Sequence, residues 1–397
     1  MKYRSTPYLR FKKFKEKWQL KVLGNLGSVA MNKRIFKEET SEVGEIPFYK
    51  IGTFGREPDS FITREKFEEY KSKYPYPEIG DILISASGSI GRTVEYLGEE
   101  AYFQDSNIVW LKHDERLDNS FLKQFYSIVK WQGIEGTTIK RLYNKNILET
   151  PIALPSVSEQ SAIGSLFRTL DDLLTSYKDN LANYQSLKAT MLSKMFPKAG
   201  QTVPEIRLDG FERKWEKKKL IDLVSPVSRK VKKPSDPYYR LSIRSHAKGT
   251  FKQFVDDPKK IAMDNLFEVK ENDLVVNITF AWEHAIAVAS KEDDGLLVSH
   301  RFPTFVIDKS DKNFINIYIK REEFRQKMDL LSPGGAGRNR VLNVKDFINI
   351  QMVVPELKEQ QAIGVYFSNL DNLISAHQEK ISQLETLKKK LLQDMFI

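Results

Sequence analysis

Basic, hydroxyl and amide side chains that could contact a polyanion occur together in polar segments of both halves of this sequence. Lysine and arginine neutralise phosphate charges, and serine, asparagine and arginine can hydrogen-bond to base edges in the DNA major groove. Their parallel placement in the two halves favours a nucleic-acid interface over a merely solvated surface. The candidate contacts are Ser85, Ser87, Ser89, Arg92, Thr138, Lys140 and Arg141 in the first half and Arg229, Lys230, Arg244, Arg338, Asn339 and Arg340 in the second.

The residue patterns that would carry catalysis are missing. There is no G-x-x-x-x-G-K-[ST] segment to hold nucleotide phosphates and no N-P-P-[YFW] loop of an amino-methyltransferase. The histidines are scattered, without the spacing of a metal site. Asp346, Glu356 and Lys358 stand in an order loosely typical of nucleases, but an internal repeat has Ser156 and Ser158 at the positions of the last two. We therefore predict no catalytic residue, no metal and no cofactor.

The composition is that of a basic, folded protein of two or three domains. The 397 residues carry a formal net charge of +10, and 41% of them are hydrophobic, which permits buried cores. The positive charge favours a polyanionic partner, nucleic acid before an anionic membrane surface. The chain has no cysteine, no signal-peptide pattern and no apolar run of roughly 18 residues. We therefore expect a cytoplasmic protein without disulfides and without a membrane span.

Two stretches that repeat one another, residues 155–196 and 355–396, organise the chain. Both open with P-x-x-x-E-Q-x-A-I-G and have no proline after that opening. Their apolar residues recur about every 3.5 positions, as in a coiled-coil seam, so each stretch predicts one long helix. Ser156 and Glu159 fit a capping box at the first helix start. The seam residues are Ile163, Phe167, Leu170, Leu174, Leu181, Ile363, Phe367, Leu370, Ile374 and Ile381.

A second repeat marks the start of the globular segment that precedes each helix. F-x-x-x-W occurs at Phe14–Trp18 and again at Phe211–Trp215. The openings and the helices repeat, whereas the interiors of the globular segments hardly do, so two similar scaffolds carry two different surfaces. The predicted domains are residues 1–154 and 204–354, the predicted helices are 155–197 and 355–397, and the linker is 198–203.

Short apolar runs bounded by turn residues predict a mixed α+β fold for both globular segments. A helix is expected at 121–130. Strands are expected at 46–51, 82–85 and 107–111 in the first segment and at 305–307 in the second, where 274–277 repeats the plan of 82–85. The apolar residues 152–154 and 352–354 lead into the two long helices.

The order of the segments also predicts how the two long helices pair. The linker is short, and the second helix has no apolar surface to cover its seam except the seam of the first. It must therefore run back antiparallel, which relates two domain–helix units by a pseudo-two-fold axis. A pseudo-two-fold protein matches two half-sites along a duplex. Because the two interiors differ, the half-sites should differ in sequence.

Over essentially its whole length, the sequence resembles the specificity subunit of a type I DNA restriction-modification system. The resemblance rests on the openings at Pro155 and Pro355, the F-x-x-x-W starts, G-D-I-L-I-S from Gly80 and T-T-I-K-R-L from Thr137. It implies two target recognition domains that each read half of a split DNA site, and paired helices that carry two methyltransferase subunits. It also implies that motor-nuclease subunits join the assembly and that this chain has no active site. The second domain departs from the first in having N-I-T-F at 277–280 where the first has its S-A-S-G-S-I-G loop.

Two other functions are compatible with parts of the pattern. A self-sufficient endonuclease or methyltransferase with a duplicated recognition region would also bind DNA, but the missing catalytic motifs argue against it. A coiled-coil adaptor without a DNA role would explain the helices and leave the paired basic segments unexplained. Activity assays on the purified chain test the first alternative, and DNA binding at two salt concentrations tests the second.

Overall fold

The computed structural model describes residues 6–133, 140–332 and 340–396. The chain divides into two compact units: unit 1 is Met1–Asp179 with Glu379–Ile397, and unit 2 is Asn180–Gln378. Each unit thus contains one globular segment, the beginning of the long helix that follows it and the end of the other long helix. The fold is α+β, as predicted, and its scaffold occurs twice.

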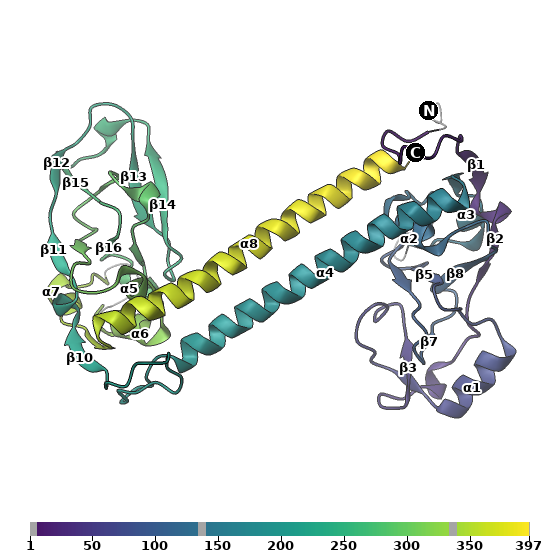
Figure 1. Cartoon of the computed structure of the whole chain (residues 1–397), viewed down its shortest axis with the longest axis horizontal. Coiled ribbons are helices and arrows are strands. Elements are labelled where there is room, and N and C mark those ends of the chain that lie inside the picture. The colour runs from purple at the N-terminus through teal and green to yellow at the C-terminus, as the bar shows by residue number, and fades with distance from the viewer. Residues whose placement is uncertain (1–5, 134–139, 333–339, 397) are drawn as a thin grey trace. The chain divides into compact units, whose positions relative to one another are not determined.

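Among its described residues, unit 1 contains short strands and three α-helices besides the long ones (Figure 1). Its elements are β1 (Gln19–Val22), β2 (Gly27–Ala30), β3 (Ile46–Tyr49), β4 (Phe61–Ile62), α1 (Arg64–Lys73), β5 (Ile82–Ser85), β6 (Thr93–Glu95), β7 (Tyr102–Phe103), β8 (Ile108–His113), α2 (Asn119–Ile128), α3 (Asn144–Leu148) and β9 (Pro151–Leu154). An antiparallel sheet has the order β2-β8-β5-β6, a smaller sheet has the order β4-β3-β7, and β1 pairs with β9.

Unit 2 repeats part of this plan and replaces the rest. Its elements are β10 (Glu216–Lys219), β11 (Ser225–Val227), β12 (Lys230–Lys232), β13 (Tyr238–Ile243), β14 (Thr250–Val255), β15 (Asn265–Glu268), β16 (Asp273–Val276), β17 (Ile286–Val288), β18 (Leu297–Val298), β19 (Thr304–Val306), α5 (Lys312–Tyr318), α6 (Glu322–Leu330), α7 (Val344–Ile348) and β20 (Gln351–Val354). The sheet β11-β19-β16-β17 and the pair β10-β20 match those of unit 1. The five-stranded sheet β12-β15-β18-β13-β14 differs from the small sheet of unit 1, so the repeated part is the scaffold.

The strands and the short helix predicted from the sequence are confirmed, and each end lies within two residues of the predicted one. The helix predicted at 121–130 is α2, which begins earlier because Asp118 caps it. One carboxylate oxygen of Asp118 accepts hydrogen bonds from the backbone amides of Ser120 and Phe121, at 2.8 and 3.2 Å. Such a cap satisfies amides that have no partner within the helix.

Both predicted long helices are present, as α4 (Val157–Lys194) and α8 (Leu357–Met395). In unit 1 the beginning of α4 runs antiparallel to the end of α8, because Asp171 pairs with Lys388 while Lys178 lies 2.8 Å from Glu385. In unit 2 the end of α4 lies against the beginning of α8 in the same way, and Lys188 pairs with Asp371 there. The predicted antiparallel pairing is therefore confirmed within each unit.

The predicted seam is buried next to the globular segments and only half-buried farther along the helices. Ile163, Phe167, Leu170, Leu174, Ile363, Phe367 and Leu370 are buried. The half-buried seam residues are Leu181, Ile374 and Ile381. Because the buried residues join the cores of the units, they anchor each helix to its own domain. A role of the seam in partner binding stays a prediction.

A buried ion pair explains why the glutamate of E-Q recurs at both helix starts. In unit 1, the carboxylate oxygens of Glu159 accept hydrogen bonds from Arg10 Nε and Nη2, at 2.6 and 2.7 Å, and from Trp18 Nε1 at 3.3 Å. The predicted capping box with Ser156 is wrong, since Arg10 and Trp18 occupy the carboxylate. Breaking a buried pair of this kind costs about 3–5 kcal/mol. The contact therefore fixes the N-terminal segment to the helix.

Unit 2 contains the same contacts between equivalent residues. Glu359 accepts from Arg207 Nε and Nη2, both at 2.7 Å, and from Trp215 Nε1 at 3.3 Å. The glycine shared by both copies of the repeat, Gly164 and Gly364, is needed because the start of a neighbouring helix approaches closely. A Cβ atom at Gly164 would lie 1.7 Å from Ser120 Oγ. The repeated motif is thus a joint between helix and domain.

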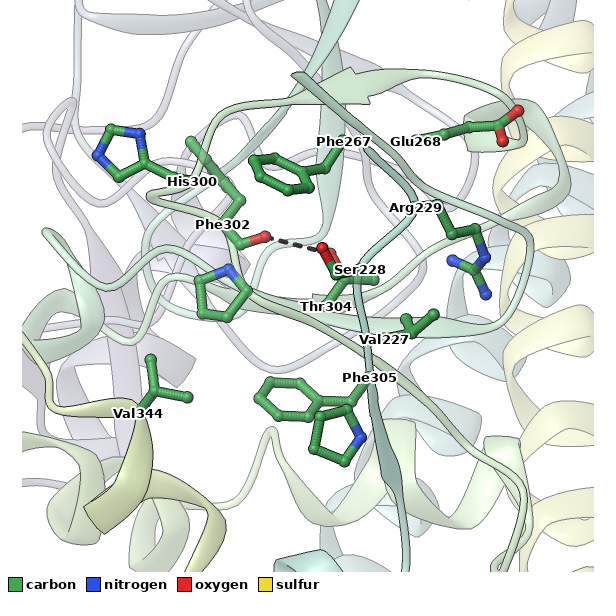
Figure 2. A pocket seen from close by; sticks show the side chains of 12 residues that line it. Val227, Ser228, Arg229, Phe267, Glu268, His300, Phe302, Thr304, Phe305 and Val344 are labelled. Carbon is green, nitrogen blue, oxygen red and sulfur yellow. Dashed lines mark hydrogen bonds between the residues drawn. The ribbon is translucent and has the colours of Figure 1, made fainter. Parts of the chain in front are cut away.

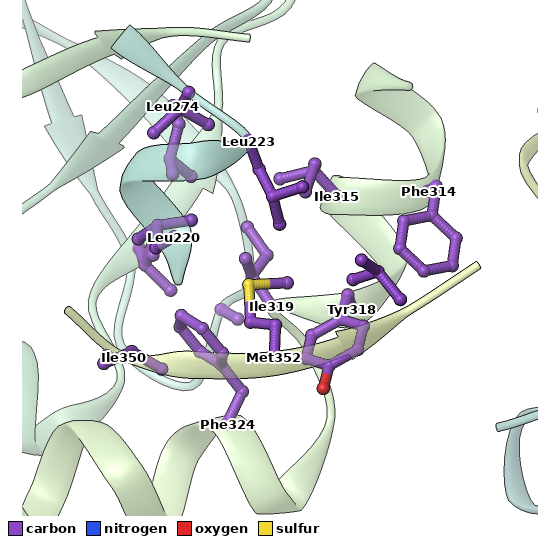
Figure 3. Packing of buried hydrophobic residues seen from close by; sticks show 14 of the residues in the cluster. Leu220, Leu223, Leu274, Phe314, Ile315, Tyr318, Ile319, Phe324, Ile350 and Met352 are labelled. Carbon is purple, nitrogen blue, oxygen red and sulfur yellow. The ribbon is translucent and has the colours of Figure 1, made fainter. Parts of the chain in front are cut away.

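The end of each long helix is buried in the core of a globular segment. In unit 1, Phe396 stacks on Phe121 with ring centroids 5.1 Å apart and meets Trp18 edge-on. In unit 2, Phe196 stacks on Phe314 at 5.8 Å. Figure 3 shows the adjoining core of unit 2, where α5 packs against β20, against Leu220 and Leu223 of the turn after β10, and against Leu274 of β16. Burial of large aromatic rings makes these ends structural parts of the units.

Candidate nucleic-acid interface

In unit 1, the loop after β5 meets the segment before α3, so two of the predicted polar segments come together. The amide of Leu142 donates to the carbonyl of Ala86 at 2.8 Å, and Ser87 and Arg141 form an antiparallel bridge. Asn107 joins them, because its Oδ1 accepts from Ser87 Oγ at 2.7 Å and from Arg141 Nη2 at 3.3 Å. Sequence analysis missed Asn107, which stands just before β8 and carries no pattern of its own.

Three other predicted contacts of unit 1 shape this loop from within. Ser85 is buried, and its Oγ donates to the carbonyl of Ser89 at 2.5 Å and accepts from the amide of Arg92 at 2.9 Å. Arg92 Nη1 donates to the carbonyl of Phe54 at 2.9 Å. These side chains hold the loop conformation, and their contact with DNA stays a prediction.

Unit 2 brings the equivalent loop and segment together. The amide of Leu342 donates to the carbonyl of Ile278 at 2.9 Å, which repeats the bond between the two segments of unit 1. Asn277 follows β16, and its Oδ1 accepts from the backbone amide and the hydroxyl of Thr279, at 3.1 and 2.7 Å. The N-I-T-F segment therefore occupies the place of the S-A-S-G-S-I-G loop.

Beside this loop lies a groove of 230 Å³, which we call the reading groove. Arg240 and Gln253 enter it from β13 and β14, Asn277 and Thr279 from the loop after β16, and Arg301 from the segment before β19. Arg240 Nε donates to Gln253 Oε1 at 3.0 Å. Arginine pairs with guanine edges and asparagine or glutamine with adenine edges, and a two-stranded ribbon fits the major groove. The side chains of the reading groove thus suit base recognition.

A second cavity of unit 2, of 220 Å³, is more apolar (Figure 2). Phe267, Phe302 and Phe305 line it, and the predicted contact Arg229 lies at its edge. Arg229 makes two hydrogen bonds to the buried carboxylate of Asp273, at 2.5 and 3.2 Å. Because Asp273 occupies the guanidinium and aromatic rings offer base edges few partners, this cavity suits DNA less well than the reading groove.

Two other arginines predicted in the second half also make internal contacts. Arg340 donates to Asp329 Oδ1 at 2.6 Å and to the carbonyl of Ser332 at 2.9 Å. Arg244 donates to the carbonyl of Thr250. A side chain held in this way can still meet a phosphate, but the structure gives Arg340 and Arg244 a role in fixing their own segments.

The remaining predicted contacts divide into exposed residues and residues without a described position. Lys140 and Lys230 are exposed, whereas Thr138, Arg338 and Asn339 lie outside the described residues. Across the described ranges, no three histidine or acidic side chains gather closely enough to hold a metal ion. No helix in those ranges has the length and hydropathy needed to cross a membrane.

Residues with strained backbone conformations form the hydrogen bonds that join the two walls of the reading groove. His246, Ala247 and His284 have φ values of 60°, 49° and 61°, which L-residues adopt at a cost of about 1–3 kcal/mol each. The amide of His246 donates to the carbonyl of Glu283 at 2.7 Å, and that of Ala247 to the carbonyl of His284 at 2.8 Å. These bonds tie the β13–β14 turn to the loop that carries Asn277.

His284 is buried within this joint. Its Nε2 lies 2.6 Å from the carbonyl oxygen of Ile319, so the N–H group at Nε2 donates a hydrogen bond to that oxygen. Burial lowers the pKa of His284 below its ordinary value, and the charges of Arg325 and His246 act in the same direction. The hydrogen bond to Ile319 and the charge of Glu322 oppose them. The folded state therefore favours a neutral imidazole.

Acidification from about pH 7.5 to about pH 5.5 is expected to destabilise unit 2 through His284. Below the ordinary histidine pKa of about 6.5, the unfolded chain binds a proton that the folded unit resists, so the stabilisation present at higher pH is lost as the pH falls. The slope from one such group is at most about 1.4 kcal/mol per pH unit. Denaturant unfolding of His284→Gln should show a weaker pH dependence than that of the wild-type chain. Equal pH dependence would contradict this assignment.

Comparison with known proteins decides the family. The sequence model described as the type I restriction modification DNA specificity domain matches twice, at residues 15–184 and 212–386. This chain belongs to that family. The resemblance predicted from the sequence is thereby confirmed, and the two matches include both polar loops and the beginnings of both long helices.

Several relatives carry the name of specificity subunits. A putative type I restriction enzyme specificity subunit of Haemophilus influenzae is 54% identical over 160 residues, which cover 40% of this chain and only 42% of that relative. The type I restriction enzyme MjaVIII specificity subunit of Methanocaldococcus jannaschii is 23% identical over 79% of this chain and 74% of its own length. The crystal structure of the type I restriction-modification S subunit from M. genitalium has a TM-score of 0.58 at 16% identity and covers 99% of both chains. At that identity, the likeness shows the fold alone.

The two specificity domains differ in side chains at equal positions of the polar loops. The repeated backbone bonds make Ala86 equivalent to Ile278 and Leu142 equivalent to Leu342. Ser87 therefore stands where the second domain has Thr279, and the residue before Leu142 is an arginine where the residue before Leu342 is a valine. The scaffold is repeated, and the groups that it presents are not.

Proposed function

We propose that this chain recognises a bipartite DNA site and directs methylation and restriction of that DNA by partner subunits of a type I restriction-modification complex. One observation carries the proposal: the same pair of loops is built twice and presents different polar side chains each time. A duplicated scaffold suits two segments of one duplex, and different side chains suit two different half-site sequences.

In this proposal, residues 1–154 and 204–354 are the two target recognition domains. The first reads its half-site with Asn107 and Arg141, while the buried Ser87 donates to Asn107 Oδ1 and holds that side chain in place. The second uses the reading groove, whose arginine, glutamine and asparagine side chains match base edges. Exposed lysines beside these sites contact phosphates, which contribute affinity without sequence preference.

The chemistry belongs, in this proposal, to partner chains in the cytoplasm. Two methyltransferase subunits modify the DNA, and motor-nuclease subunits cleave unmodified DNA. The chain itself selects the site and catalyses neither reaction. Support comes from the family, whose curated relatives are named as specificity subunits of restriction enzymes.

Replacing Lys140 and Arg141 with alanine should weaken DNA binding and reduce its salt dependence. Each phosphate contact releases counterions, so the logarithm of affinity falls with the logarithm of salt concentration by about 0.9 per contact. Lys140 contacts a phosphate, and the charge of Arg141 displaces counterions even when its side chain meets a base edge, so loss of both charges should flatten the slope by about two units. Fluorescence anisotropy with labelled target DNA, measured between about 50 and 200 mM salt on the chain assembled with its methyltransferase, gives both quantities.

A matched control is Lys390→Ala, which removes an exposed charge from α8 instead of from a polar loop. This variant should keep the wild-type salt slope. Affinity that does not depend on salt, or no DNA binding with the methyltransferase present, would overturn the proposed function. An unchanged slope in the double variant alone would remove only the assignment of Lys140 and Arg141.

A further inference from the structure

The apolar cavity of unit 2 lies where strands of its two larger sheets meet, and we call it the phenylalanine cavity (Figure 2). Three phenylalanine rings and two proline rings line it. They belong to Phe267 of β15, to Phe305 of β19, and to Pro226, Phe302 and Pro303. Its volume is 220 Å³. An apolar cavity of about 150 Å³ already holds benzene, so this one has room for one or two fused rings.

The charged groups at the edge of the phenylalanine cavity are already paired within unit 2. The guanidinium of Arg229 makes two hydrogen bonds to Asp273, and Lys270 Nζ lies 2.7 Å from Glu268 Oε1. The hydroxyl of Thr304 donates to a backbone carbonyl at 3.1 Å. The described lining therefore offers no unpaired carboxylate or guanidinium to an ionic ligand. Because a buried charge without a partner is costly, the cavity favours a neutral ligand.

The matching position of unit 1 carries a tryptophan. Leu83 and Val275 are equivalent, because each stands three residues before the loop residue that makes the repeated backbone bond. Trp110 of β8 lies opposite Leu83, and Thr304 of β19 lies opposite Val275. The side chain of Trp110 is buried and packs in one core with Leu83, whereas Thr304 lines the phenylalanine cavity. The shared sheet thus holds an indole ring at this position in unit 1 and lacks one in unit 2.

We infer that the phenylalanine cavity is a binding site for a neutral, planar aromatic ring system of about the size of indole. Aromatic rings attract one another in offset or edge-to-face arrangements, which adds to the gain from burial of apolar surface. A nucleobase suits the cavity less well, because its polar edge loses hydrogen bonds to water and gains few partners. The ring belongs to a free small molecule or to a side chain of another protein, and both sources present the same chemistry. The inference does not depend on the proposed function.

Isothermal titration calorimetry of the full-length chain with indole tests the site. Indole should bind saturably as one equivalent, with a Kd on the order of 0.1–1 mM for a ligand of about nine non-hydrogen atoms. Adenine, which has a similar size but a polar edge, should bind at least about tenfold more weakly. N-acetyltryptophanamide separates the two sources. Binding as tight as that of indole assigns the cavity to a side chain, and weaker binding assigns it to a free molecule.

Thr304→Trp gives unit 2 the ring that unit 1 has at this position. The variant should bind indole at least about tenfold more weakly and unfold at a higher temperature, because its own side chain fills the cavity. The control Lys309→Trp adds an exposed tryptophan outside the cavity and should keep both wild-type values.

Phe267→Ala keeps the inference testable if Thr304→Trp does not fold. It removes one ring from the wall of the cavity and should also weaken indole binding. Three results would overturn the inference: a wild-type chain that binds no indole, adenine that binds as tightly as indole, or folded cavity variants that bind indole with wild-type affinity.

Discussion

Alanine at both Arg240 and Arg301 is expected to relax or abolish recognition of one half-site while the other half-site stays unchanged. Both arginines line the reading groove, and neither belongs to unit 1. A good bidentate contact between arginine and guanine discriminates against a wrong base by about 1–3 kcal/mol. Loss of two such contacts should lower selectivity at the affected bases on the order of a hundredfold or more. Sequencing of methylated positions in cells that carry the variant and the partner subunits reads both half-sites at once.

The matched substitution in unit 1 is Asn107→Ala. It removes the oxygen that holds Ser87 and Arg141 together, so it should alter only the other half-site. The two variants therefore serve as controls for each other, because each should preserve the half-site that the other changes. If either variant altered both halves of the modified sequence, the two domains would not read DNA separately.

The scaffold could be predicted from the sequence because its signals are local or repeated. A seam of apolar residues specifies a long helix from spacing alone, and the repeat shows which features belong to the scaffold. The reason for the repeated E-Q was not readable, since the partners of Glu159 lie more than 140 residues away in the chain. The sequence also could not show that Leu181 is only half-buried, because the exposure of a seam residue depends on which other side chains cover it in the fold.

The binding surface was less predictable, because the sequence does not show whether a basic residue in a loop is free to contact DNA or already forms an ion pair within the protein. Arg229 was selected as a DNA contact, but Asp273, which lies 44 residues further along the chain, accepts two hydrogen bonds from it. Gln253 and Arg301 lie in separate strands or connections, and only the fold brings them into one groove. A pattern of neighbouring residues can predict a loop, whereas the residues of a groove formed by several strands are far apart in the sequence and form no such pattern.

Insertion of one heptad into each long helix is expected to widen the gap between the half-sites or to abolish activity. A whole heptad keeps the seam in phase and adds about 10.5 Å, at about 1.5 Å per residue. With about 3.4 Å per base pair, this length corresponds to about three base pairs. These base pairs also rotate one half-site by about a third of a turn, so affinity can fall before a wider gap is accepted.

The structure supplies the matched insertion points that this test needs. Lys178 of α4 lies 2.8 Å from Glu385 of α8, so an insertion after Lys178 faces an insertion just after Leu384. A chain with only one insertion is the control, because it cannot keep both the Asp171–Lys388 pair and the Lys188–Asp371 pair in register and should lose stability. Methylation mapping then measures the gap between half-sites in the doubly extended chain. Full activity with the original spacing would show that the helices do not set the distance, whereas a gap wider by about three base pairs would show that they do.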